Sequence, residues 1–231
     1  MPRSNEFGQP IGDDLGPWSA PPVPPRDALV GRHVTLEPLD AARHAAGLAE
    51  AFVDAPATLW TYLFTDPLRT MDAFTAWIDP IADVDGWRPY AAVLDGSPVG
   101  FMSYMRIDAT VGSIEIGSIG FSPSLQRTTA ATETLYLLMA RAFELGYRRL
   151  EWKCDALNDP SRRAAERLGF RYEGTFRQAT HYKRRNRDTA WFSITDAEWP
   201  AIDAAFRSWL DPSNFDQRGV QRTALCSPRS R

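Results

Sequence analysis

The chain has 231 residues, a formal net charge of −3 and a hydrophobic content of 44%. This length suits one well-buried domain with extra arms, and the negative charge argues against bulk nucleic-acid binding. The three histidines and the two cysteines, Cys154 and Cys226, lack metal-ligand spacing and suggest no disulfide framework, which fits a reducing cytoplasm. No apolar segment resembles a signal peptide or is long enough to span a membrane, so we expect a soluble, cytoplasmic protein.

Residues 1–29 are expected to form an N-terminal arm. They contain seven prolines, which favour extended conformations over a packed core. Phe7, Ile11 and Trp18 give this arm apolar side chains that could lie against a domain surface. The domain is expected over residues 30–210, followed by an irregular tail over residues 211–231.

The first half of the domain has the patterns of a strand, a helix and a β meander. Val34 and Leu36 alternate with polar residues and predict a strand, after which Asp40 is the expected N-cap of a helix. Two β-prone runs on either side of Asp95-Gly96 predict a hairpin, because glycine tolerates the positive φ of such turns. A third run at residues 112–121 extends the meander.

The second half alternates helices and strands. A helix is predicted from about residue 126 to residue 146, followed by a strand at 148–158, a short helix at 159–170, and two strands around the charged segment 183–187. Thr195 and Glu198 can form a capping box before a last helix. One face of the long helix carries Ala131, Leu135, Leu138, Ala142 and Leu145. The order of elements predicts a mixed α/β (α+β) domain.

The segment 121–133 reads as a strand that passes through a tight turn into the long helix. Such a turn directs unpaired N–H groups and the positive end of the helix dipole toward one point, which suits a pyrophosphate. The turn contains no glycine, so we expect its residues to keep negative φ, with Arg127 and the threonine hydroxyls adding hydrogen bonds. The alternative is that Thr128 is only an N-cap and Arg127 a solvated surface charge.

This turn resembles the Q/R-x-x-G-x-G/A signature of the GNAT superfamily of N-acetyltransferases. Gln126, Thr129 and Ala131 occupy its three defining positions, and Thr129 replaces the first glycine. The following Thr132 and Glu133 complete an "ATE" ending that is typical of the ribosomal-protein N-acetyltransferase (Rim-like) branch. The branch's N-x-x-S-x-x-x-x-E-x-L-G-F run is matched in register by Asn158, Ser161, Glu166, Leu168, Gly169 and Phe170. The likeness extends from about residue 30 to residue 200.

The resemblance implies a single GNAT-type domain whose central, mostly antiparallel sheet is splayed at its middle strands and flanked by helices. It implies acetyl-CoA or another acyl-CoA as the donor, without a metal. The backbone around Ile119 and Phe121 would pair with the pantetheine arm, while Asn158 would hydrogen-bond it and Ser161 would meet the thioester sulfur, unless both only cap the following helix. The remaining implied donor contacts are Gln126, Arg127, Thr128, Thr129, Ala130, Ala131, Thr132 and Arg162.

A general base is required because the acceptor amine is protonated near neutral pH. Glu115 is ranked first, since several family members carry a catalytic glutamate in this strand, although its side chain could face either side of the sheet. The branch can also place a glutamate where Thr180 stands here, followed by His181. Many family members have a tyrosine acid at the position of Ala165. Catalytic roles are therefore predicted for Glu115, Ser161 and Asn158.

The predicted function is acyl-CoA-dependent transfer of an acetyl or other short acyl group to a primary amine by direct attack. The acceptor would be a small molecule or a protein N-terminus, with a homodimer as one possible assembly. An alternative is a catalytically silent acyl-CoA-binding regulatory module. A second is an RNA-associated protein that uses the charged segment 183–187, which is more often a solvated turn. Trp60 and Tyr62 could line an aromatic acceptor pocket, unless they belong to the core.

Overall fold

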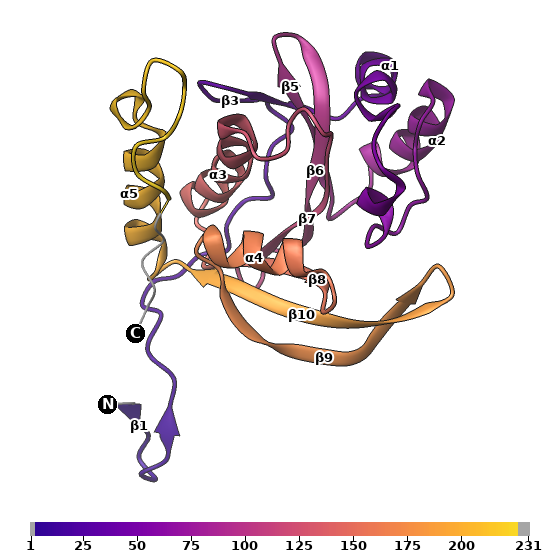
Figure 1. The fold of residues 1–231 in the computed structure, drawn as a ribbon. Helices are drawn as coiled ribbons and strands as arrows, with labels where there is room; N and C mark the ends of the chain where they lie inside the picture. The colour runs from indigo at the N-terminus through magenta and orange to yellow at the C-terminus, as the bar shows by residue number, and fades with distance from the viewer. Residues whose placement is uncertain (1–2, 226–231) are drawn as a thin grey trace.

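The computed structural model describes residues 3–225, so the prediction for Cys226 lies outside the described residues. One eight-stranded sheet has the order β3-β4-β5-β6-β7-β8-β10-β9 and is mixed, with a single parallel pair, β7 and β8 (Figure 1). Its strands are β3 (Leu29–Val30), β4 (Thr35–Pro38), β5 (Arg88–Leu94), β6 (Ser97–Asp108), β7 (Ser113–Phe121), β8 (Arg149–Asp155), β9 (Arg171–Tyr182) and β10 (Arg185–Thr195). The helices are α1 (Ala41–Phe52), α2 (Met71–Ala82), α3 (Thr129–Glu144), α4 (Asp159–Arg167) and α5 (Trp199–Leu210), with 3-10 turns η1 (Ala57–Trp60) and η2 (Pro212–Asn214).

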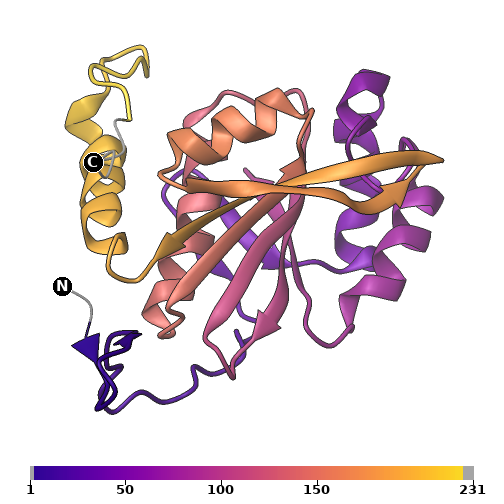
Figure 2. The same cartoon turned by 90° about the horizontal axis from the view of Figure 1, so that it is seen from below.

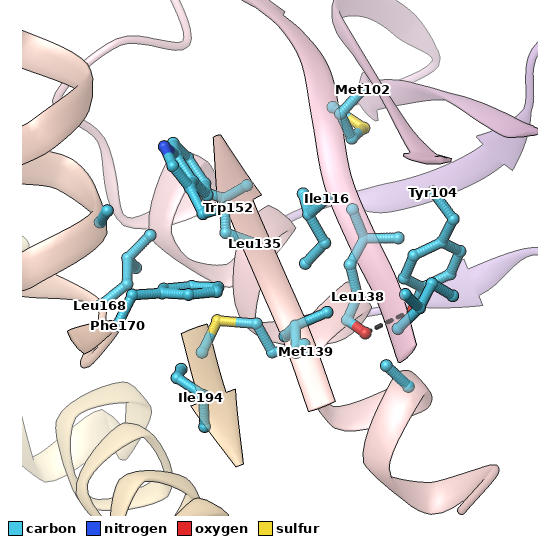
Figure 3. Packing of buried hydrophobic residues seen from close by; sticks show 14 of the residues in the cluster. Met102, Tyr104, Ile116, Leu135, Leu138, Met139, Trp152, Leu168, Phe170 and Ile194 are labelled. Carbon is cyan, nitrogen blue, oxygen red and sulfur yellow. Dashed lines mark hydrogen bonds between the residues drawn. The ribbon is translucent and has the colours of Figure 1, made fainter. Parts of the chain in front are cut away.

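Helices cover both faces of the sheet. On one face, α3, α4 and α5 bury the larger core, where Leu135, Leu138 and Met139 of α3 pack against the strands (Figure 3). The Tyr104 hydroxyl donates a hydrogen bond to the Leu138 carbonyl within this core. On the other face, α1 and α2 bury an aromatic cluster around Phe52. The predicted mixed α/β class is confirmed.

The central strands separate after a short parallel contact. The β7–β8 pairing covers only Ser113–Glu115 and Arg149–Glu151, so both strands continue beyond it without each other. A bulge in β7 accompanies this separation, because Ser118 has a φ of 51° and the register with β6 shifts beside it. The predicted splay is thus present, and it leaves backbone groups of β7 unpaired on the β8 side.

The sequence prediction omitted α2. This helix begins after Thr70, whose hydroxyl accepts a hydrogen bond from the Ala73 amide, and it buries Phe74 and Ile78. Pro80 lies in its last turn, where a proline weakens the helical signal. Together with η1, this helix closes the second core.

The N-terminal arm contacts the domain through its second half only. Residues Arg3–Ser4 and Pro10–Ile11 form a small hairpin (β1, β2) that projects away from the domain, as Figure 1 shows. Of the apolar side chains expected to lie on the surface, Phe7 is 78% exposed, whereas the Trp18 ring lies beside Gly112, where a Cβ atom would be 3.1 Å from it. Pro21 and Pro24 are buried. Carbonyl groups of the arm accept hydrogen bonds from Arg88, Tyr90 and Tyr147.

The charged segment 183–187 is partly solvated, with Arg184 and Arg185 exposed, but several of its cations also make contacts within the protein. Only Lys183 and Arg184 form the turn, both at positive φ, while the next residues belong to β10. The Lys183 ammonium donates to the Trp60 carbonyl at 2.7 Å, and Arg185 donates to the Thr61 carbonyl at 2.7 Å. Arg187 is only 9% exposed. The hairpin therefore uses these cations to hold the loop after η1, toward which it extends in Figure 2.

Thr195 and Glu198 do interact, but they lie before the first residue of α5 and therefore do not form the expected capping box. The Glu198 carboxylate accepts from the Thr195 amide and hydroxyl, but the helix begins only after Glu198, so this bond closes the preceding turn. Over residues 3–225, none of the helices is both long and apolar enough to cross a membrane.

Candidate active site

The turn before α3 reaches its geometry without glycine by placing Arg127 in the left-handed region. Its φ is +61°, which contradicts the expectation of negative φ throughout the turn. A non-glycine residue in this region costs about 1–2 kcal/mol. Thr128 is the N-cap of α3, which was the alternative interpretation of this residue. Its hydroxyl accepts a hydrogen bond from the Ala131 amide at 3.0 Å and donates one to the Leu125 carbonyl.

The start of α3 leaves backbone donors free beside a cavity. Among residues 3–225, the amides of Thr129 and Ala130 have no hydrogen-bond partner. A cavity of about 690 Å³ opens beside them, lies between α3 and α4, and reaches the end of β7 at Phe121. Arg127 and Arg167 line this cavity, and no described carboxylate does. Free amides, a helix N-terminus and two cations suit a polyanionic ligand.

The cavity brings together most of the predicted donor residues. Those that line it are Phe121, Gln126, Arg127, Thr128, Thr129, Ala131 and Thr132. Five others do not line it: Ile119, Ala130, Asn158, Ser161 and Arg162. The Gln126 side chain donates to the Phe121 carbonyl at 2.8 Å, so it holds the strand end next to the turn. Arg162 is directed elsewhere, with its guanidinium 5.3 Å from the centre of the Tyr172 ring.

Asn158 and Ser161 lie at the start of α4, beside the end of β8. The Asn158 side chain accepts from the Ser161 amide at 3.2 Å and is therefore the N-cap of α4. The Trp152 indole N–H donates to the Ser161 hydroxyl oxygen at 3.1 Å, which leaves the hydroxyl hydrogen available for another acceptor. Ala165 is fully buried and its methyl group carries no ionisable hydrogen, so α4 supplies no proton donor from that position.

Glu115 faces the α1 and α2 side of the sheet, opposite to α3. It lies at the last parallel pair before the strands separate, and only 8% of its side chain is exposed. The Lys153 ammonium lies 2.9 Å from Glu115 Oε2 and 2.7 Å from Glu151 Oε2, and 3.8 Å from the centre of the Trp191 ring. Glu115 thus belongs to a buried ionic cluster, which sequence reasoning did not identify.

Burial raises the pKa of the Glu115 carboxyl, and the Lys153 ammonium opposes this increase. The second carboxylate oxygen, Oε1, faces Gly117: a Cβ atom at that glycine would lie 3.0 Å from it. Gly117 therefore allows the Glu115 carboxylate and the Met105 sulfur to lie close to the backbone, where a Cβ atom would be 3.0 and 2.8 Å from them. This contact is located where the two strands begin to separate.

The other proposed acceptor-side residues have structural contacts. Trp60 is buried against Phe52 and Phe101 and belongs to the core. Tyr62 donates its hydroxyl hydrogen to the Leu157 carbonyl at 3.0 Å, which fastens the loop after η1 to the loop before α4. His181 is exposed on β9, where it pairs with Asn186. Its neighbour Tyr182 is buried instead, with its hydroxyl bonded to Asp155 at 2.8 Å.

Several residues of the site were not predicted. Lys153 lies in a strand that sequence reasoning identified, but its neighbours come from two other strands. Trp209, Phe215, Gly219 and Gln221, from the end of α5 and the irregular segment after it, also line the cavity. The sequence gives little signal for this segment beyond its aromatic and arginine residues.

Glu133, of the "ATE" ending, has a structural position. Its carboxylate accepts from the Arg32 and His33 amides at 2.9 and 2.6 Å and fastens the β3–β4 turn to α3. Gly31 permits this approach, because a Cβ atom there would lie 2.7 Å from the Glu133 carboxyl carbon. Glu133 therefore holds α3 to the β3–β4 turn and does not line the cavity.

Comparisons with known proteins agree with this geometry. The family model described as "Acetyltransferase (GNAT) domain" matches residues 33–171. A GCN5-related N-acetyltransferase from Brucella melitensis is 46% identical, with a TM-score of 0.88, covering 91% of this chain and 97% of that one. A probable GNAT-family acetyltransferase from Chromobacterium violaceum is 42% identical, with a TM-score of 0.79, covering 84% and 98%. "Putative ribosomal N-acetyltransferase YdaF" of Bacillus subtilis is 28% identical over 74% of this chain and 95% of its own length.

The family model covers more than half of the chain, and its match includes β4 to α4 with the splayed strands and the turn before α3. The chain therefore belongs to the GNAT family of acetyltransferases, as its sequence motifs predicted.

Proposed function

We propose that the protein transfers an acetyl or similar short acyl group from acyl-CoA to a primary amine by direct attack of the amine on the thioester. The observation that supports this proposal is one continuous site. The cavity reaches from the end of β7, where β7 has separated from β8, to the free amides at the start of α3. Pantetheine would extend along the unpaired edge of β7, and the pyrophosphate would accept hydrogen bonds from the Thr129 and Ala130 amides.

The reaction needs a base on one face of the sheet and support for the leaving thiolate on the other. We propose that Glu115 accepts the proton of the ammonium through Oε1, directly or through a water molecule. The neutral amine then attacks the thioester carbonyl, and the C–S bond breaks when the tetrahedral intermediate collapses. The second proton of the nitrogen then passes to the departing thiolate, which leaves as the free thiol. The Ser161 hydroxyl, positioned by Trp152, would donate a hydrogen bond to the sulfur as negative charge develops on it.

The acceptor would approach from the α1 and α2 side, because Glu115 faces that side. A small amine or a protein N-terminus fits this direction, and the name of the relative YdaF favours the second. Free-thiol release from acetyl-CoA, measured over amino acids, polyamines and N-terminal peptides, tests the function. Binding of CoA without turnover on any amine would favour the catalytically silent regulatory module. This alternative is worth testing because Ala165 stands where many family members have a tyrosine acid.

Donor binding should stabilise the folded protein. At a hundredfold excess of acetyl-CoA over its Kd, the free energy of unfolding should rise by about 2.7 kcal/mol, because the ligand binds only the folded state. Thermal melts with acetyl-CoA, CoA and succinyl-CoA measure this shift. A melting temperature that none of these compounds changes at millimolar concentration would contradict the proposed donor site.

Ser161→Ala should lower kcat about tenfold or more with little change in donor affinity, because the hydroxyl would meet charge that appears only during the reaction. Ser161→Thr, which keeps a hydroxyl group, is the matched control and should retain most of the activity. Steady-state kinetics with thiol detection separates kcat from KM. If kcat of the alanine variant stays within about twofold of the wild type, a change typical of neutral substitutions, the serine is only part of the helix start.

A further inference from the structure

The donor cavity has a wall that lies outside the segment matched by the family model. We call residues 211–225 the tail segment. Phe215, Gly219 and Gln221 of this segment line the cavity together with Trp209 at the end of α5. In both ribbon views α5 and the tail segment lie beyond α3 and α4, on the side away from α1 and α2 (Figures 1 and 2). The wall is therefore at the far end of the cavity from α1 and α2.

Side-chain hydrogen bonds fix the tail segment in this position. The Asn214 amide donates to the Trp209 carbonyl at 2.9 Å and to the Thr223 carbonyl at 3.1 Å, while its oxygen accepts from the Thr223 amide. Trp209 also donates its indole hydrogen to Gln221 at 2.8 Å. The Phe215 ring packs edge-on against Trp209, with ring centres 5.5 Å apart. These contacts hold the tail segment in a defined conformation against the end of α5.

The order of groups in CoA determines which part would reach this wall. If the pantetheine lies along β7 and the pyrophosphate at the start of α3, the adenosine must continue into the remaining part of the cavity. That part is bounded by Arg167 and Leu168 at the end of α4 and by the tail segment. It offers an aromatic ring and a cation, and Arg218 and Arg222 flank its lining residues in the sequence. These groups suit a purine base and a phosphate.

We infer that the tail segment is the adenosine-binding wall of the donor site, with Phe215 as its contact to the purine ring. This inference rests on the proposed acyl-CoA donor. It adds that the adenosine part of CoA is bound by residues outside the segment 33–171 that the family model matches. Base–aromatic stacking is worth enough to change affinity by about tenfold.

Three probes divide the donor into parts: CoA, adenosine 3′,5′-bisphosphate and 4′-phosphopantetheine. Phe215→Leu removes the aromatic face but keeps an apolar side chain against Trp209. By calorimetry, this variant should bind CoA and the bisphosphate about tenfold more weakly, and should bind phosphopantetheine with unchanged affinity. Phe215→Tyr keeps the ring and should bind all three like the wild type. Val220→Ala is the control from the same segment, since Val220 is 58% exposed and does not line the cavity.

The outcomes separate this inference from the proposed function. Equal CoA affinity in Phe215→Leu and wild type, or an equal loss for all three probes, would overturn the inference. Thermal melts without ligand check that the variants are folded, and Phe215→Ala gives a second measurement if the leucine occupies the same space. Thiol release by the wild type tests the function independently. Its absence would reject acyl transfer even if the probes bind.

Discussion

Glu115→Gln should lower acetyl transfer by about a hundredfold or more, because the amide keeps the shape of the side chain but cannot accept a proton from the ammonium. The loss should be partly recovered at high pH, where more of the acceptor amine is already neutral. Initial rates over a range of pH with a fixed amine give this comparison.

The raised pKa of Glu115 determines how both the reaction rate and the stability should change with pH. Burial raises the pKa of the Glu115 carboxyl, so in the wild type the base is lost by protonation at a higher pH than for an ordinary glutamate. The acidic limb of the rate profile should therefore lie above the usual range and disappear in Glu115→Gln. A raised carboxyl pKa also means that the free energy of unfolding falls as pH rises from the ordinary glutamate pKa of 4.5 through the folded-state pKa. The glutamine variant should lose this decrease.

Two controls identify the base. Glu151→Gln removes the other carboxylate that contacts Lys153, and the acidic limb should remain but move to lower pH if Glu115 is the base, because the Glu151 charge helps to raise the Glu115 pKa. His181→Ala removes the remaining candidate, whose side chain is exposed. Full activity in Glu115→Gln together with a loss in His181→Ala would assign the proton transfer to the histidine.

Lys153→Met should lower the free energy of unfolding by roughly 1–3 kcal/mol, because Glu115 and Glu151 lose their shared cation. Glu115 keeps Arg106 at 3.3 Å and Glu151 keeps Arg149 at 2.7 Å, so neither carboxylate is left without a cation. The Lys153 side chain is only 6% exposed and contacts Glu115, Glu151 and the Trp191 ring. Urea denaturation measures the change. The matched control is Arg163→Met, since Arg163 and Asp159 form an ion pair at 4.0 Å with side chains 70% and 73% exposed. Such surface pairs contribute about 0–1 kcal/mol.

A double-mutant cycle shows whether the loss comes from the buried pair. Glu115→Gln in the Lys153→Met background should restore part of the stability, because it removes a buried negative charge that has lost its closest cation. Strictly additive effects of the two substitutions, or a Lys153→Met loss no larger than that of Arg163→Met, would show that the cluster is not coupled.

The sequence predicted those parts of the fold whose signal is local. Asp95 and Gly96 adopt the positive φ of the expected hairpin turn, and Leu150, Trp152 and Cys154 all face the larger core as their alternation predicted. The helix α2 was missed although Phe74 and Ile78 have helical spacing, since Pro80 interrupts the pattern. Local pattern therefore failed at this helix breaker and at Thr195 and Glu198, whose expected capping box does not start α5.

The candidate site was predictable only where backbone groups define it. The turn before α3 was located by its motif, but the left-handed φ of Arg127 was not, because arginine rarely adopts it. The neighbours of Glu115 depend on the parallel register of β7 and β8, which are separated in the chain by α3. The role of Phe215 depends on the docking of a segment without periodicity. Tertiary register and loop docking have no local signature.

The segment over which β7 and β8 are unpaired is bounded at both ends. The short parallel pairing lies at one end, and at the other the loop after η1 is tied to the loop before α4 by Tyr62 and to the β9–β10 hairpin by Lys183 and Arg185. If the donor binds on the α3 side and the acceptor approaches from the α1 side, as we propose, the two substrates would not compete for one entrance. The kinetic mechanism should then be sequential, with both substrates bound before either product leaves.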